Sequence, residues 1–331
     1  MLVVLAMLSG SEAHAAQFCV NSQNAFQAAL TTAQANGEDD VIRVVAGTYA
    51  LTSGLFFSSS EIHLLQVLGG FSTGCQAQTS GFSVLDGQDQ YQTLRITNDY
   101  GETHVEHFSI QNGLNNFMFD GGGGMEISSL SGSIYVELCE FIGNNAGFAG
   151  ALLAGSGTGT MFIRNNLVFG NTAGAVGGVA LSEDSGVAFV VGNTVVLNHD
   201  TQIGTGGIGL IGNGYYALNN NILWNNNQNS NVDLNASAPH SRYSNDIGSI
   251  GGTAIADVVS GELSVDPHFL QCGLLCFSFA LADDSPLIDA GDENALGGMT
   301  SVDLDFLPRV MGAHVDIGAF ENDHMFGNGF E

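Results

Sequence analysis

A pattern of Asn and Gly residues recurs in the middle of the chain every 27 residues. The Asn residues of this pattern are Asn144, Asn171, Asn198 and Asn225. The apolar residue that follows each glycine-containing turn recurs with steps of 27, 27 and 29, at Met125, Leu152, Val179 and Ile208. A period of roughly 20–50 residues is typical of solenoids, in which each repeat packs only against its neighbours.

The segments between these turns are short and strand-like. Residues 161–169 are rich in aromatic and β-branched side chains, and no repeat carries a ten-residue helical pattern. We therefore predict an all-β protein, a right-handed parallel β-helix with about eight rungs of roughly 27 residues. Equivalent side chains of adjacent rungs would stack about 4.8 Å apart, so the four Asn residues would form a ladder of side-chain amides.

The two ends of such a solenoid need covering, because open strand edges invite aggregation. Residues 22–36 place Phe26, Ala29, Leu30 and Ala33 on one helical face, and Gly37 follows. We predict that this helix caps the first rung. Residues 16–264 would form the β-helix with its N-terminal cap, residues 265–321 the C-terminal rungs and cap, and residues 322–331 a tail.

The charge balance excludes several classes of partner. The chain has 33 acidic residues and five basic ones, all Arg, and its formal net charge is -28. Because few cations could neutralise phosphates, we expect no binding to nucleic acid or to anionic membranes. No stretch reaches the roughly 18 apolar residues of a transmembrane helix. We expect a monomer.

The N-terminus predicts export. An apolar run from Leu2 to Leu8 precedes the small-residue site Ala13-His14-Ala15, so residues 1–15 resemble a secretory signal peptide. An exported protein can carry disulfides. Among the five cysteines, disulfides between Cys19 and Cys75 and between Cys272 and Cys276 are plausible, although sequence alone leaves the connectivity open. Cys139 would remain a buried thiol.

Two groups of motifs resemble known families. DDVIRVVAGTY (39–49), LQVLGGFSTGC (65–75), VLDGQ (84–88) and VEHFSIQNG (105–113) resemble secreted bacterial right-handed parallel β-helix proteins of the pectate-lyase-like superfamily. VDPHF (265–269), SPLIDAGD (285–292), DLDFLPRV (303–310) and VDIGAFE (315–321) resemble the choice-of-anchor Q domain. Phe306 stands where that resemblance leads us to expect Gly. Such families include polysaccharide lyases and hydrolases, but also surface proteins without catalytic activity.

The residues argue against catalysis on this scaffold. A lyase needs a basic residue to take a proton, and the few Arg residues have other expected roles: Arg164 would stack on Glu137, and Arg309 would pair with Asp289 or Asp316. A hydrolase needs two carboxylates roughly 5–9.5 Å apart in one groove. We assign no catalytic residue and no required cofactor. We predict a secreted or cell-surface structural, adhesive or carbohydrate-binding protein; the alternative is a polysaccharide hydrolase or lyase.

Calcium is the ligand that best suits the remaining carboxylates. Asp303, Asp305 and Asp316 are the candidates, because Ca²⁺ prefers hard carboxylate oxygens in loops. The alternative is that these side chains cap turns. An extracellular polysaccharide or cell-surface component is the expected partner. Exposed rings at Tyr215, Tyr216 or Trp224 would favour sugar binding, whereas buried rings would be part of the core.

Overall fold

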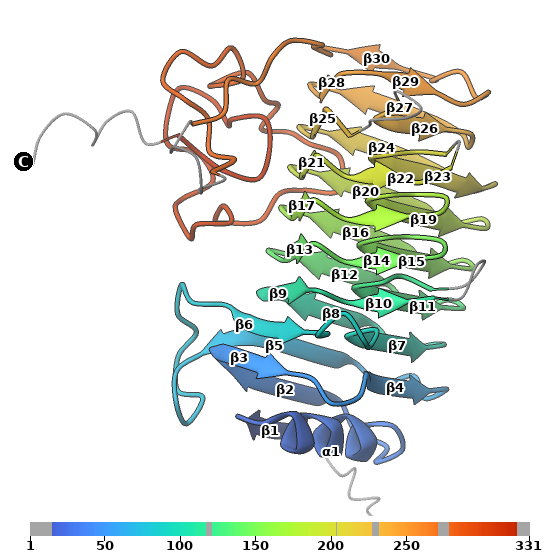
Figure 1. The fold of residues 1–331 in the computed structure, drawn as a ribbon, viewed down its shortest axis with the longest axis vertical. Helices are drawn as coiled ribbons and strands as arrows, with labels where there is room; N and C mark the ends of the chain where they lie inside the picture. The colour runs from blue at the N-terminus through green and yellow to red at the C-terminus, as the bar shows by residue number, and fades with distance from the viewer. Residues whose placement is uncertain (1–14, 117–120, 203, 227–231, 271–277, 323–331) are drawn as a thin grey trace, which may run out of the picture.

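The chain forms a parallel β-helix, as predicted. The computed structural model describes residues 15–116, 121–202, 204–226, 232–270 and 278–322. Strands of successive turns pair in parallel, and three long sheets, A, B and C, run along the coil (Figure 1). With eight strands each in sheets B and C, the solenoid has about eight turns.

The strands occur in the following order. Sheet A contains β1 (Ala16–Val20), β2 (Asp40–Val45), β5 (Leu65–Phe71), β8 (Thr103–Glu106), β12 (Ile134–Glu137), β16 (Thr160–Arg164), β20 (Val187–Val191), β24 (Tyr215–Asn219), β27 (His240–Tyr243) and β30 (Val259–Ser260). Sheet B contains β3 (Gly47–Ala50), β6 (Ser83–Asp86), β9 (Phe108–Gln111), β13 (Glu140–Ile142), β17 (Leu167–Phe169), β21 (Thr194–Val196), β25 (Ile222–Trp224) and β28 (Asp246–Ile247). Sheet C contains β4 (Leu55–Ser59), β7 (Leu94–Asn98), β11 (Met125–Ser129), β15 (Leu152–Ser156), β19 (Val179–Glu183), β23 (Ile208–Gly212), β26 (Leu234–Ala236) and β29 (Ile250–Gly251). A short sheet D contains β10 (Leu114–Asn115), β14 (Asn145–Ala146), β18 (Thr172–Ala173) and β22 (His199–Asp200).

The interior of the coil is filled by columns of apolar side chains. In sheet A, Val136, Ile163, Val190 and Leu218 are direct register partners, and each is at most 3% exposed. Burying apolar surface contributes about 25 cal/mol per Å² of area removed from water. The strands therefore alternate between buried and more exposed residues, as in β2 and β4.

A ladder of buried Asn side chains links the turns, and its last member differs from the sequence expectation. The side-chain nitrogen of Asn144 donates to the oxygen of Asn171, that of Asn171 to Asn198, and that of Asn198 to Asn226, each at 2.8 Å. Asn225 is exposed, with a backbone φ of 55°. The prediction that Asn225 is the fourth member of the ladder was therefore wrong by one residue, since Asn226 holds that position.

The register explains this difference. Val179 pairs with Ile208, a step of 29, but Val187 pairs with Tyr215, a step of 28. The turn before β23 is therefore two residues longer than in the previous rung, and the turn after β23 is one residue shorter. Since the net insertion is one residue, the ladder position moves from 225 to 226.

A second ladder runs beside the first. Asn166 donates to Asn193 at 2.9 Å, Asn193 to Asn221 at 2.9 Å, and Asn221 to Asn245 at 2.8 Å. Each of these amides also bonds to backbone groups of neighbouring turns; Asn166, for example, donates to the carbonyl of Val136 at 2.9 Å. Buried amides thus find partners on both sides, as a low-dielectric interior requires.

The N-terminal cap is a helix, α1 (Gln23–Ala33), as predicted. Its buried residues are Phe26, Ala29, Leu30 and Ala33, and Ser22 is its N-cap. The ring of Phe26 lies 6.2 Å from that of Phe108, so the helix closes the apolar interior at this end. Residues 1–14 of the expected signal peptide, and residues 323–331 of the expected tail, lie outside the described residues.

Cys19 and Cys75 form a disulfide, whereas Cys139 is a buried free thiol. Burial raises the pKa of the Cys139 thiol to about 12, so the group is inert near neutral pH. The expected pair Cys272–Cys276 lies outside the described residues. In the part of the chain that the structure describes, no helix is long and apolar enough to cross a membrane.

The C-terminal segment lies beside the coil rather than over its end. Figure 1 shows it, in orange and red, flanking β13 to β25. Phe279, Leu281, Leu287, Leu304 and Ile317 pack with apolar residues of sheet B. Backbone atoms of Ala319 bond to Asn165 and to Thr194, on successive turns. The expectation of an end cap in residues 265–321 is therefore corrected: the apolar outer face of sheet B attracts this segment.

We predict that Asn226→Ala lowers the free energy of unfolding by about 2–4 kcal/mol, because it leaves buried donors of Asn198 and a buried carbonyl unpaired. Asn225→Gly is the matched control and should change it by less than about 1 kcal/mol, since glycine accepts a positive φ. Chemical denaturation followed by circular dichroism measures both. Equal effects of the two variants would contradict the ladder assignment.

Candidate functional site

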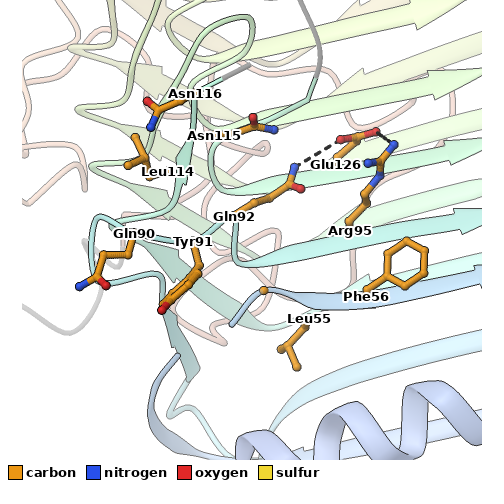
Figure 2. A pocket seen from close by; sticks show the side chains of 11 residues that line it. Leu55, Phe56, Gln90, Tyr91, Gln92, Arg95, Leu114, Asn115, Asn116 and Glu126 are labelled. Carbon is orange, nitrogen blue, oxygen red and sulfur yellow. Dashed lines mark hydrogen bonds and ion pairs between the residues drawn. The ribbon is translucent and has the colours of Figure 1, made fainter. Parts of the chain in front are cut away.

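An open hollow of about 680 Å³ lies on the outer surface where sheet C meets the turns that precede it (Figure 2). Three parts of the chain form most of its lining: the start of β4, the turn between β6 and β7, and strand β10. Its lining residues are Gly54, Leu55, Phe56, Gln90, Tyr91, Gln92, Arg95, Leu114, Asn115, Asn116 and Glu126. Binding sites for small molecules are concave surfaces of this size class.

An ion pair forms one wall of the hollow. Arg95 on β7 and Glu126 on β11 are direct register partners, and their Nη2 and Oε1 atoms are 3.1 Å apart. Gln92 donates to Glu126 Oε2 at 3.3 Å and to the carbonyl of Gly122 at 2.7 Å. Glu126 is thereby held in place and largely buried, while the Arg95 side chain is 44% exposed. The wall offers hydrogen-bonding groups with little net charge.

Two aromatic rings complete the hollow. Phe56 is the register partner of Arg95 on the outer face of sheet C, and it is 46% exposed. Tyr91 lies in the turn on the opposite side of the hollow, close to Gln90 (Figure 2). An exposed ring beside carboxamide groups can pack on the apolar face of a sugar while the amides bond to its hydroxyl groups. Apolar surface with a few convergent polar groups is typical of a ligand site.

A second aromatic feature on the outer face of sheet A has a different character. His104, Tyr135, Phe162 and Phe189 stack on one another, with centroid separations of 4.1, 4.5 and 5.4 Å. The Arg164 guanidinium lies over the rings of Tyr135 and Phe162. Since the faces inside the stack are occupied by neighbouring rings, we assign this stack to stabilisation of the sheet.

The aromatic residues singled out in the sequence lie elsewhere. Tyr216 is fully buried, and Tyr215 is half-buried with its hydroxyl hydrogen-bonded to Ser241. Trp224 packs against the cluster formed with the C-terminal segment. Sequence reasoning missed Phe56, Arg95 and Glu126, because residues 39 and 31 apart pair here and the 27-residue period fails.

Every Arg side chain is already engaged. Arg95, Arg164, Arg242 and Arg309 form ion pairs with Glu126, Glu137, Glu262 and Glu321 respectively. Arg43 donates to Gln17 at 2.8 Å and lies over the ring of Phe71. The expected partner of Arg164 was correct. For Arg309, the expected partners were Asp289 or Asp316, but the paired carboxylate is that of Glu321.

Two of the residues proposed for calcium, Asp303 and Asp316, accept hydrogen bonds from the backbone in this structure, and calcium binding stays a prediction. The carboxylate of Asp303 accepts the backbone N–H groups of Leu307 and Glu321, at 2.7 and 2.8 Å. That of Asp316 accepts the backbone N–H groups of Asp289 and Asn322, both at 2.7 Å. These contacts are those of the alternative role, in which the side chains cap turns. Among the described residues, no group of three or more His, Cys, Asp and Glu side chains could hold a metal ion.

Several carboxyl groups are buried and hold protons more tightly than usual. Burial raises the pKa of Glu183 to about 7, and its Oε1 accepts the N–H of Gly186 at 3.0 Å. Burial likewise raises the pKa of Asp303 to about 6 and that of Glu321 to about 8, although Arg309 opposes both shifts. None of these groups lines the hollow, so we assign them to the fold.

Comparison with known proteins supports no family assignment. No family model matches the sequence, and no curated protein matches it. A crystal structure of pectate lyase Pel9A is similar at 16% sequence identity and a TM-score of 0.45, over 94% of this chain and 97% of that chain. A likeness at this level carries no inference about function, and the strand pairing itself establishes the β-helix. The resemblance of residues 265–321 to the choice-of-anchor Q domain stays a prediction.

We predict that the protein is more stable in mild acid than at pH 8. Glu183 has a pKa of about 7 in the folded chain against an ordinary value of 4.5, so the folded chain binds more protons between these values. Stability is therefore lost as the pH rises through this window. Glu183→Gln should reduce the loss by roughly 2 kcal/mol, because glutamine keeps an acceptor for Gly186 but does not titrate. Denaturation at pH 5 and at pH 8 measures the loss of stability for the unaltered protein and for Glu183→Gln. An equal loss in the two proteins would refute the assignment of the pH dependence to Glu183.

Proposed function

We propose that this protein is an extracellular carbohydrate-binding β-helix without catalytic activity, and that its ligand occupies the hollow lined by Phe56, Tyr91, Gln92, Arg95 and Glu126. The observation that carries the proposal is the exposed Phe56 ring beside a neutral, hydrogen-bonding wall. A saccharide supplies both complements: apolar C–H faces for rings, and hydroxyl groups for amide and paired charged groups.

The charges favour a neutral glycan over a uronic acid polymer. The chain has a net charge of -28, and Arg95, the one cation among the described residues that line the hollow, is neutralised by Glu126. A polyanionic chain would meet repulsion with no free cation to offset it. We therefore expect ligands made of uncharged sugars, in a structural or adhesive role at the cell surface or in secreted material.

The hollow gives little support to the enzymatic alternative. Glu126 is the only carboxylate among its described lining residues, whereas glycoside hydrolases use two. Arg95 is held by an ion pair, so it is a poor candidate for the base of a lyase.

Export is supported by the Cys19–Cys75 disulfide, since disulfides persist mainly in oxidising compartments.

The test is binding of the full-length protein to a panel of soluble neutral and uronic polysaccharides, measured by isothermal titration and affinity electrophoresis. Phe56→Ala and Tyr91→Ala should each weaken binding of a neutral glycan about tenfold, because each removes a packing surface. Tyr100→Ala is the matched control, since Tyr100 is 48% exposed and outside the hollow.

Reducing ends and unsaturated products are followed in the same incubations. Binding without products supports the proposal. Release of products that is lost in Glu126→Gln would instead establish an enzyme, and binding that is unaffected by Phe56→Ala and Tyr91→Ala would place the ligand elsewhere. Absence of binding across the panel would leave a purely structural protein and overturn the proposal.

A further inference from the structure

Strand β4, which carries Phe56, has a neighbouring strand on one side only. It is the first strand of sheet C, and among the described residues only β7 pairs with it. The N–H of Leu55 points toward β7 and donates to the carbonyl of Thr93 at 3.0 Å. Because successive residues of a strand direct their backbone groups to opposite sides, the N–H and C=O of Phe56 face the free edge. These two groups need partners that a strand does not supply.

Helix α1 supplies both partners through the side chain of Gln27. Its Oε1 accepts the N–H of Phe56 at 2.9 Å, and its Nε2 donates to the carbonyl of Phe56 at 2.9 Å. A carboxamide has an acceptor and a donor side by side, so it bonds both groups of one residue as a neighbouring strand would. The same Nε2 donates to the hydroxyl of Thr31 at 3.2 Å, one turn along the helix. The carboxamide is therefore fixed between the helix and the strand.

A second glutamine of α1 makes the same kind of contact, but with residues outside the hollow. Gln23 lies one turn before Gln27. Its Oε1 accepts the N–H of Thr52 at 3.0 Å, and its Nε2 donates to the carbonyl of Ser53 at 2.8 Å. Neither Thr52 nor Ser53 lines the hollow. The two contacts share one chemistry, and only that of Gln27 reaches a residue of the proposed ligand site.

The position of the Phe56 ring depends on the backbone that carries it. The residue is 46% exposed, so packing holds its ring less than it holds a buried one. Its neighbour on the outer face of sheet C is Arg95, and Figure 2 shows the two side chains next to each other. Helix α1 is firmly anchored, since Phe26 and Leu30 are fully buried in the coil. A contact from this helix can therefore set where the ring lies relative to the polar wall.

We propose that Gln27 is a positioning residue of the ligand hollow: its carboxamide fixes the backbone of Phe56 and so holds the ring where a sugar packs on it. This inference rests on the proposed function, since Gln27 acts through Phe56 and does not line the hollow. Gln27→Met tests it, because methionine keeps an unbranched side chain of similar length and removes both bonds. Gln23→Met is the matched control on the same helix.

The first measurement is backbone amide exchange in the full-length protein, followed by NMR. Gln27→Met should speed exchange of the Phe56 amide at least about tenfold, because that N–H loses its acceptor. Gln23→Met should leave the Phe56 amide unchanged and speed exchange of the Thr52 amide instead. An unchanged Phe56 amide in Gln27→Met would overturn the proposal without any glycan being present.

The second measurement is titration with a neutral glycan. Gln27→Met should weaken binding about fivefold and Gln23→Met should not, whereas Gln27→Met added to Phe56→Ala should cause no further loss. Gln27→Glu should weaken binding at pH 7 and regain it at about pH 4, relative to the unaltered protein at each pH, because a protonated carboxyl again donates to the Phe56 carbonyl.

The outcomes separate this inference from the proposed function. Equal weakening by Gln23→Met, additive losses from Gln27→Met and Phe56→Ala, or binding that needs Phe56 but not Gln27 would overturn the positioning role alone. Absence of glycan binding by the unaltered protein would overturn it together with the proposed function.

Discussion

The register between adjacent turns is the constraint on which every other feature of this fold depends. Two ladders of buried Asn side chains hold it, because each amide bonds to the next amide and to the backbone of neighbouring turns. A slip of one residue would move apolar side chains to the surface and leave these amides unpaired in the interior. An unpaired buried polar group costs about 1–3 kcal/mol, so several per ladder make the alternative registers inaccessible.

The first ladder ends on a carboxylate, and its direction explains why. Each amide donates toward the C-terminal end, so the final donor is the side chain of Asn226, which donates to Asp233 Oδ1 at 3.0 Å. The other oxygen of Asp233 accepts the hydroxyl of Ser249 at 2.7 Å. Aligned amide dipoles present their N–H ends to this carboxylate, and hydrogen bonds to an ionised acceptor are stronger than those between neutral groups. Asp233 thus terminates the ladder inside a shortened rung.

The sequence predicted the fold wherever rung length was constant, and failed where turns change length. Asn144, Asn171 and Asn198 follow one period, but a single net insertion moves the next member to Asn226. The earliest rungs have long turns, so Phe56 and Arg95 could not be recognised as neighbours from spacing. The C-terminal segment has no period at all. Its position, and the pairing of Arg309 with Glu321, depend on tertiary contacts that no local pattern encodes.

Phe306 shows how the C-terminal segment is tied to the coil at the expense of local backbone geometry. Its φ is 66°, in the left-handed region where the resemblance leads us to expect Gly. A side chain there costs roughly 1–2 kcal/mol. The ring of Phe306 lies 4.2 Å from that of His107, which in turn stacks on Phe82 at 4.4 Å. Aromatic pairs contribute about 0.5–1.5 kcal/mol beyond burial. The ring contact therefore offsets much of this backbone strain, and the same contact helps to bury His107, whose pKa burial lowers to about 4.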